Sequence, residues 1–329
     1  MRRREVLWGG LAAAVGAAVG RAAVSGAAEA RARVVVIKVE DRRDGIRRAL
    51  GLLGGGDFTR RHVVVKPNFN STDPFPGSTH PGTLGGLVDW LGGAGASRVT
   101  VADRSGMGVT REVMEAKGVF AQGRKLGFAS VVFDELPARD WVAHRLAGSH
   151  WQRGVLVPRL LEEAEAIVST CCLKTHRFGG HVTLSLKNSV GAVAKYGPDG
   201  YNYMSELHGS AAQRRMIAEI NLVYRPALVL LDGLEAFVRG GPDAGTRVVP
   251  GVIIAGTDRV AVDAVGVAVL RLYGTTPEVA AGPIFRQEQL ARAAELGLGV
   301  SRPELIDLVT DDAAGEAFLA RVRPVLLHA

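Results

Sequence analysis

Two lysines, two histidines and an asparagine fall between positions 174 and 188, and these are the side chains of the sequence best suited to chemistry. They are Lys174, His176, His181, Lys187 and Asn188. Of the 40 basic residues only seven are lysine, and the 329 residues include only five asparagines. Because arginine serves almost everywhere else, the retained lysines and asparagines indicate positions that need a compact ammonium or a small amide. We therefore expect a functional site that includes this segment.

Polar side chains also follow several predicted strands, at the point where each strand ends. They are Lys66 and Asn68 after strand 62–65, Asp103 after 99–102, Lys174 and His176 after 166–172, and Asp232 after 227–231. In an open parallel sheet the carboxyl ends of the strands share one edge, and ligands bind there where the strand order reverses. We therefore expect these side chains to face one volume. The two aspartates could instead be turn residues, a common role for Asp after a strand.

One chemistry that fits this cluster is the binding and conversion of a small anion. Lys66 and Lys174 would hold a carboxylate or phosphate, and His176 would transfer protons as a general acid or base. Lys187 would be a second cation or, if burial lowers the pKa of its amine, a base or nucleophile. The catalytic candidates are therefore His176, Lys187 and Asp232. The candidates for substrate binding are Lys66, Asn68, Lys174, His181, Asn188 and His208.

The alternative chemistry is a metal site formed by His176, His181 and Asp232, because neutral imidazole and carboxylate suit divalent metal ions. The Gly-Gly pair at 179–180 would fold His181 back toward His176. The spacing of these residues matches no standard metal-binding motif, and neighbouring lysines would repel a cation. We therefore favour the anion over the metal, and a packing role for the histidines also stays open.

Two helix starts add weaker signals. The segment 79–87 opens a predicted helix whose free backbone N–H groups could receive an anion, but it contains no nucleotide-binding glycine motif. Asp258 is placed to cap the predicted helix 259–272. Asp263 lies inside the apolar face of that helix, which is an unusual position for a carboxylate.

The first thirty residues have the features of an export signal. Arg3 and Arg4 precede a weakly apolar run of about thirteen residues, and Ala28-Glu29-Ala30 is a small-x-small cleavage site. This resembles a twin-arginine signal peptide over residues 1–30. The run is shorter than the roughly 20 apolar residues that span a bilayer, so we expect cleavage and no stable membrane span afterwards. The protein would then be periplasmic or extracellular, with a retained membrane tether as the alternative.

The net charge and the aromatic content indicate which kinds of ligand the protein can bind. Removal of residues 1–30 lowers the formal charge from +7 to +5, because four arginines and two glutamates leave with them. The remaining chain has no Lys/Arg run, and only 6% of all residues are aromatic, which argues against a nucleic-acid surface. The modest positive excess fits a small anionic ligand.

The two cysteines, Cys171 and Cys172, are adjacent and end an apolar stretch. Without a Cys-x-x-Cys pair, we expect no iron–sulfur cluster or Cys-based zinc site from this chain's own cysteines. We interpret both as small buried strand residues, with a strained disulfide between them as the alternative. The cofactor stays unknown, and a metal stays an open alternative.

Short Val/Ile-rich segments alternate with longer amphipathic ones along the chain. The predicted strands are 33–39, 62–66, 98–102, 130–133, 166–171, 227–231 and 252–255, and the predicted helices are 44–53, 83–93, 111–126, 211–224, 259–272 and 284–296. This alternation predicts an α/β fold with a mostly parallel sheet flanked by helices. We expect one domain over 31–329, which could consist of two intertwined lobes. Gly and Pro turns make the segment 191–209 a candidate lid or ligand-binding loop.

The sequence resembles the uncharacterised family known as domain of unknown function 362. The resemblance covers residues 34–310 approximately and depends on Lys66-Pro67-Asn68, the 79–87 helix start, Leu173-Lys174-Thr175-His176, Leu186-Lys187-Asn188 with Gly191, His208, Asp232-Gly233, Gly241-Pro242 with Gly245, and Asp258 with Val262-Asp263. It implies an α/β fold and no settled activity. Members of the family often carry ferredoxin-like cysteine motifs for iron–sulfur clusters. This chain has none, so electron transfer would require a separate redox partner.

Our leading hypothesis is an exported enzyme that acts on a small carboxylate or phosphate through a Lys/His cluster. The first alternative is a non-catalytic protein that binds an anion or a cofactor. The second is a His/Asp metalloenzyme or a redox-associated protein. All three depend on the same residues converging on one cavity.

Overall fold

The computed structural model describes residues 30–328, so the expected export signal lies outside the described residues except for Ala30. A large sheet has the strand order β12-β1-β11-β9-β7-β2-β3-β4. Its strands are β1 (Ala32–Lys38), β2 (His62–Lys66), β3 (Arg98–Asp103), β4 (Ala129–Val132), β7 (Ala166–His176), β9 (Leu228–Gly240), β11 (Val252–Gly256) and β12 (Ile306–Val309). Along this path only β11 runs against the others. The mostly parallel α/β sheet expected from the sequence is therefore confirmed.

Three short pairings complete the strands. Strand β8 (His181–Thr183) folds back on β7, and β10 (Gly245–Val248) folds back on β9, both as antiparallel hairpins. Strands β5 (Trp141–His144) and β6 (Val155–Pro158) form a separate two-stranded sheet. The segment 137–160, which has no clear pattern in the sequence, is thus partly ordered by its own hairpin.

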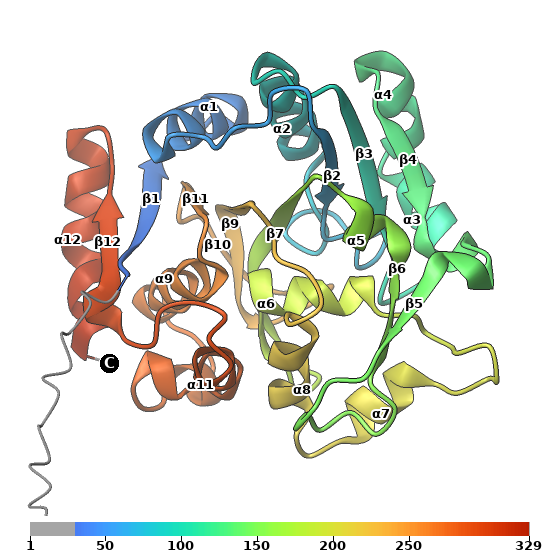
Figure 1. Ribbon diagram of the computed structural model, residues 1–329. Helices are drawn as coiled ribbons and strands as arrows, with labels where there is room; N and C mark the ends of the chain where they lie inside the picture. Colours follow the sequence, from blue (N-terminus) through green and yellow to red (C-terminus); the bar gives the residue numbers. More distant parts are fainter. Residues whose placement is uncertain (1–29, 329) are drawn as a thin grey trace, which may run out of the picture.

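Helices cover both faces of the sheet (Figure 1). One face carries α1 (Arg42–Leu53), α2 (Pro81–Gly93), α3 (Thr110–Ala116) and α4 (Val119–Leu126). The other carries α8 (Gln213–Ile220), α9 (Arg259–Leu272), α11 (Glu288–Glu295) and α12 (Ala313–His328). The remaining helices are the short α5 (Arg159–Glu163), α6 (Ser185–Asn188), α7 (Tyr203–Gly209) and α10 (Pro277–Ala280).

Alternation along the strands explains why both faces are covered. In β1, Val34 and Val36 belong to the core on the α9 side, whereas Val35 and Ile37 belong to the core on the α1 side. Successive strand side chains point to opposite faces, so a strand that is apolar at every position needs a helical layer on each side. All residues of β7, near the centre of the sheet, are buried.

The observed elements differ from the sequence-based expectations at several positions, and three differences bear on the site. Strand β9 continues past the predicted end at residue 231 to Gly240, so Asp232 lies within a strand and not after one. The predicted helix 111–126 is divided into α3 and α4 because Gly118 adopts a left-handed conformation with φ of 70°. Strand β7 continues past residue 171 to His176, since Lys174, Thr175 and His176 pair with β8. Lys174 still pairs in parallel with Phe237 of β9, whereas the pairing of β7 with β2 ends at Ser169.

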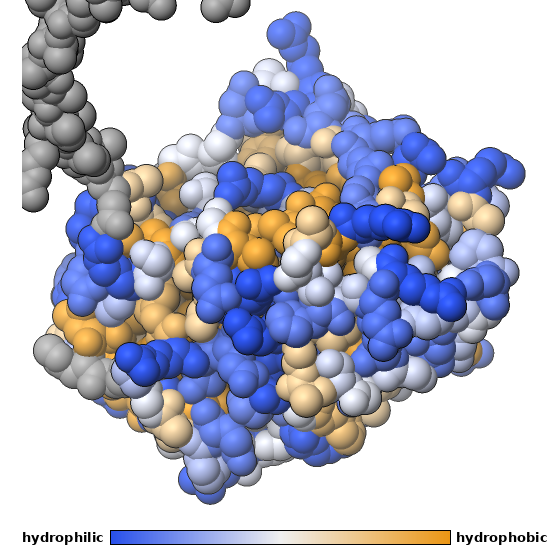
Figure 2. Space-filling view, turned by 60° about the horizontal axis from the view of Figure 1, so that its bottom comes forward, coloured by the Kyte–Doolittle hydropathy of each residue, from blue (hydrophilic) through white to orange (hydrophobic). Residues whose placement is uncertain are grey.

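The order of the strands reverses between β2 and β7. From β2 the chain moves outward to β3 and then β4, and it returns to pair β7 with the opposite side of β2 before moving on to β9. Such a reversal leaves a crevice at the carboxyl ends of the two strands. In the part of the chain that the structure describes, no helix is both long and apolar enough to cross a bilayer. Hydrophilic residues cover most of the face shown in Figure 2, with apolar residues gathered in strips between them.

Candidate functional site

A small cavity of about 120 Å³ lies at the carboxyl ends of β2, β3 and β7, at the strand reversal. Seven of the residues expected from the sequence line it: Lys66, Asn68, Asp103, His176, Lys187, Asn188 and His208. Lys174, His181 and Asp232 are not among its lining residues. The structure thus brings together most of the expected cluster and places three members elsewhere.

Lys66, the last residue of β2, forms a buried ion pair with Asp103, the last residue of β3. Its Nζ lies 2.5 Å from Asp103 Oδ1 and also donates to the Pro67 carbonyl at 3.0 Å. Asp103 accepts further hydrogen bonds from the Phe69 and Arg104 backbone N–H groups at 2.7 and 2.8 Å. Burial raises the pKa of the Asp103 carboxyl, and the Lys66 ammonium opposes this rise. Lys66 is therefore partly neutralised by Asp103 at the floor of the cavity.

Asn188 ties this pair to α6. Its amide nitrogen donates to Ser169 Oγ at 3.0 Å and lies 3.3 Å from the carbonyl oxygens of Lys66 and Thr170. Its carbonyl oxygen lies 3.4 Å from Lys66 Nζ. Asn188 is consequently a residue that holds β2, β7 and α6 together, and its side chain has little capacity left for a ligand.

Lys187 is the cationic group of the cavity that lacks a partner. The residue is 8% exposed, and its amine has no hydrogen-bond acceptor or carboxylate among residues 30–328. Burial, with the positive charges of Lys174 and Arg104, lowers the pKa of this amine from 10.5 to about 7. A Cβ at Gly180 would lie 2.6 Å from Lys187 Cε and 3.0 Å from His176 Nδ1, so both side chains occupy space that glycine leaves open.

Asp263 fixes the backbone that carries Lys187. Both of its carboxylate oxygens accept backbone hydrogen bonds at the start of α6, from Ser185 at 2.7 Å and Leu186 at 2.8 Å. Burial raises the pKa of Asp263 to about 7 against the effect of these bonds. Asp258, by contrast, caps α9 through the backbone N–H groups of Val260 and Ala261. The carboxylate that is unusual in the sequence therefore holds the backbone of the segment that carries Lys187.

His176 is a neutral imidazole at the wall of the cavity. It is 7% exposed, its Nδ1 has no hydrogen-bond partner within the described chain, and its ring meets Phe178 edge-on at 5.7 Å. Burial, followed by the charges of Lys187 and Lys174, lowers the pKa of His176 far below its usual value. A neutral imidazole has one donor and one acceptor nitrogen. His208 lies at the exposed side of the cavity, with Nδ1 placed 2.7 Å from the Met204 carbonyl oxygen.

Three polar lining residues are not among the site candidates chosen from the sequence: Asn70, Arg104 and Thr183. Arg104 is buried and donates to the carbonyl oxygens of Ser105 at 3.1 Å and Val190 at 2.6 Å, while its Nε has no partner. Asn70 is one of the five asparagines of the chain, and the rarity of this residue type indicates a functional position. Arginine is so common in this chain that the residue type of Arg104 gives no such indication.

The three expected residues that lie elsewhere are held by other partners. Lys174 is fully buried and donates to the Gly77 carbonyl at 2.5 Å, because a buried ammonium needs an acceptor. Asp232 accepts from Thr83 at 2.5 Å and from Arg42 Nε at 3.1 Å, on the α2 side of the sheet. His181 pairs with His176 across the hairpin, as the Gly-Gly hinge implied, but its pKa is lowered by burial and by Arg214 of α8.

The candidate metal ligands are therefore not assembled, since Asp232 is engaged on the α2 side. Among residues 30–328, no group of three or more His, Cys, Asp or Glu side chains lies close enough together to hold a metal ion. Cys171 and Cys172 are both buried and free, and burial raises the pKa of each thiol. Two uncharged, enclosed thiols in β7 behave as small core residues.

The cavity is positively charged and contains polar atoms without partners. Asp103 is the one carboxylate among its lining residues, and Lys66 offsets it, which leaves Arg104 and Lys187 in excess. Five buried polar atoms of the lining residues have no hydrogen-bond partner in the described chain: Asn68 Oδ1, Asn70 Nδ2, Arg104 Nε, His176 Nδ1 and Thr183 Oγ1. Buried polar groups are normally satisfied, so this group of atoms fits a bound polar molecule.

Comparisons with known proteins identify the family of the chain. None of the curated proteins compared with the chain matches it. Among solved structures, the lactate racemase apoprotein from Thermoanaerobacterium thermosaccharolyticum is similar, with 18% identity and a TM-score of 0.40 over 62% of this chain. The match spans 50% of that chain. The model of a family described as domain of unknown function (DUF362) matches residues 63–268, which include β2, β3, β7, α6 and most of α9. The chain belongs to the DUF362 family.

Proposed function

We propose that this protein is an enzyme that binds a small anion in the cavity and transfers a proton on it through Lys187 and His176. The observation that supports this best is the set of buried polar atoms without partners beside an unpaired lysine. Arg104 Nε and Asn70 Nδ2 are donors, and Lys187 adds a third donor when it is protonated. Such a set suits the oxygens of a carboxylate or phosphate.

The size of the cavity limits the ligand. Pockets for drug-sized molecules have volumes of roughly 300 to 1,000 Å³. At about 120 Å³, this cavity suits a group of a few heavy atoms, such as a short carboxylate or a phosphate. Lys66 and Lys174, the anion-binding lysines expected from the sequence, have smaller roles in the proposal because Asp103 and the Gly77 carbonyl engage them.

Lys187 is suited to accept a proton. With a pKa of about 7, roughly half of its amines are neutral at pH 7, and a base works best when its pKa is close to the working pH. The amine would take a proton from the carbon next to the carboxylate and return it, so an N–H bond forms as the C–H bond breaks. Arg104 and Asn70 would stabilise the negative charge that develops, and neutral His176 would donate or accept a hydrogen bond at the reacting group.

The test measures binding and proton exchange separately. Acetate, pyruvate, malonate and phosphate are titrated into the protein by calorimetry, and the carboxylates are incubated with it in D₂O and followed by NMR. Lys187→Met should abolish the exchange of carbon-bound hydrogen for deuterium, while Lys125→Met, a change at an exposed lysine of α4, should leave it intact. Binding without exchange across the carboxylates would favour a non-catalytic anion-binding protein. No binding of any of the four anions would contradict the anion site itself.

The proposal places this activity outside the cytoplasm. Its support is the sequence of the first thirty residues, with Arg3 and Arg4 before a short apolar run and a small-x-small site at Ala28-Glu29-Ala30. A small anion met outside the cytoplasm would be the substrate.

A further inference from the structure

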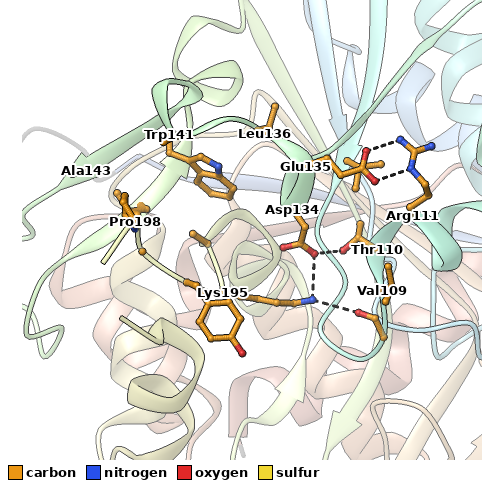
Figure 3. Close-up of a pocket in the computed structure, with 17 residues that line it drawn as sticks. Val109, Thr110, Arg111, Asp134, Glu135, Leu136, Trp141, Ala143, Lys195 and Pro198 are labelled. Carbon is orange, nitrogen blue, oxygen red and sulfur yellow. Dashed lines mark hydrogen bonds and ion pairs between the residues drawn. The ribbon is translucent and has the colours of Figure 1, made fainter. Parts of the chain in front are cut away.

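Figure 3 shows a second and larger hollow, which has a volume of about 660 Å³. Its walls come from the loop after β3, the segment around Asp134 to Trp141, strand β6 and the segment 194–198. We call it the groove. Its volume lies in the range of pockets that accept drug-sized molecules. Residues 194–198 belong to the segment 191–209, the candidate ligand-binding loop of the sequence, whereas none of the individual candidates for substrate binding lines the groove.

The groove and the small cavity share two walls. In the loop after β3, Gly106 and Met107 line the cavity, and the next residues, Gly108 to Arg111, line the groove. Farther along the chain, Val190 and Gly191 line the cavity, and residues 194–198 line the groove. Neighbouring Cα atoms are about 3.8 Å apart, so Met107 and Gly108 place the two hollows within one residue of each other. A ligand that occupies both hollows would have to pass over this stretch of the chain.

The two hollows have opposite chemistry. The charged groups of the groove are already paired: Asp134 accepts from Thr110 at 2.5 Å and from Lys195 at 3.2 Å, and Arg111 binds Glu135 at 2.5 and 2.7 Å. No groove residue contributes to the buried polar atoms without partners that are found among residues 30–328. The rest of the lining is largely apolar and includes Leu136, Trp141, Ala143, Leu156 and Pro198. Figure 3 shows the Trp141 ring facing the hollow, across from Lys195.

Exposed apolar side chains gather at these two hollows. Of the seven large hydrophobic residues that are exposed in the described chain, Val109 and Tyr196 line the groove, and Met107 and Phe178 line the cavity. Val109 is 57% exposed and Tyr196 is 62% exposed. Exposed apolar groups that cluster around a concave surface mark binding sites, whereas scattered ones do not.

We infer that the groove binds the apolar tail of a carboxylate whose charged end occupies the cavity, so the substrate is an amphiphilic anion with an alkyl or aryl chain. This inference rests on the proposed function, because it places the anion beside Lys187. Met107 lies at the boundary between the hollows, and its flexible thioether can move aside as a chain passes.

The experiment uses straight-chain carboxylates from acetate to octanoate with the intact protein, and calorimetry measures their affinity. Once the chain enters the groove, each added methylene should raise the affinity about fourfold. Ala143→Phe fills the groove from an exposed position in β5, where an aromatic residue is compatible with a strand. Ala143→Phe should lower the affinity for octanoate at least tenfold, by about 1.4 kcal/mol or more, and should leave the affinity for acetate unchanged. Ala129→Phe is the matched control, since Ala129 is exposed in β4 and lines neither hollow.

Two outcomes separate this inference from the proposed function. If acetate binding depends on Lys187 but octanoate binds no more tightly than acetate, the groove inference is overturned and the proposed function stands. 1-Octanol has the tail without the charge. Suppose that Ala143→Phe weakens the binding of 1-octanol, that octanoate binds no more tightly than 1-octanol, and that acetate does not bind. The groove then accepts apolar chains, but the anion site is wrong.

Discussion

The lowered pKa of Lys187 makes the stability of the protein depend on pH in a way that one substitution removes. In the unfolded chain the amine titrates at its ordinary value of 10.5, and in the folded protein it titrates at about 7. Below pH 7 both states carry the proton, and the folded state bears the full cost of burying the charge. Above pH 7 the folded lysine loses its proton while the unfolded lysine keeps it, so the free energy of unfolding rises with pH up to about 10.5.

The size of this effect follows from the two pKa values. A difference of one bound proton changes the free energy of unfolding by about 1.36 kcal/mol for each pH unit. Because the folded lysine is already half deprotonated at pH 7, integration from pH 7 to pH 9 gives about 2.3 kcal/mol. In Lys187→Met this contribution is absent, and the buried charge is removed as well. The variant should therefore be more stable than the wild type at pH 7, and its advantage should shrink by about 2 kcal/mol at pH 9.

Urea unfolding at pH 7, 8 and 9, followed by far-UV circular dichroism, measures this difference. Burial raises the pKa values of the Cys171 and Cys172 thiols, which lowers stability as the pH rises, but both proteins contain these thiols, so their effect cancels in the comparison. Lys125→Met controls for the loss of an exposed lysine. If the wild type and Lys187→Met show the same dependence on pH, Lys187 keeps its proton in the folded state and is not the base that we propose.

Two further predictions concern the shape of the cavity and the location of the protein. Gly180→Ala should reduce anion binding or proton exchange at least tenfold without removing a functional group, because the new Cβ would lie 2.6 Å from Lys187 Cε. Gly209→Ala, where a Cβ meets nothing within 4 Å, should behave as the wild type in the same calorimetric and NMR measurements. Changing Arg3 and Arg4 together to lysine should retain the protein in the cytoplasm, as measured by cell fractionation and immunoblotting. Equal export of this double variant and the wild type would contradict a twin-arginine signal.

The sequence predicted the framework of the site better than its details. Runs of Val and Ile identified the strands, and the rule that ligands bind at the carboxyl ends of parallel strands correctly brought Lys66, Asn68 and His176 to one cavity. This worked because strand ends are positioned by backbone pairing, which local patterns reveal. The rarity of asparagine also pointed in the right direction, since Asn68, Asn70 and Asn188 all line the cavity.

The sequence could not show which polar groups find partners in distant segments. Lys174 donates a hydrogen bond to the Gly77 carbonyl, and Asp232 accepts hydrogen bonds from Arg42 and Thr83. These contacts depend on how loops and α2 pack against the sheet. No spacing in the chain encodes them. Arg104 could not be predicted because its role depends on its full burial beside β3. In a chain with so many arginines, the sequence does not indicate which arginine is buried.

The position of β1 within the sheet determines when the protein can complete its folding. Its neighbours are β11 and β12, so the first strand, which ends at Lys38, must wait for partners that begin at Val252 and Ile306. While the ribosome is still making those residues, the edges of β1 have no hydrogen-bond partners from these strands, and contacts so distant along the chain form slowly. The pairing of β1 is therefore complete only after the residues of β12, which end at Val309, have been made. An export route that accepts folded proteins, as we propose from the first thirty residues, would let these distant strands pair before transport.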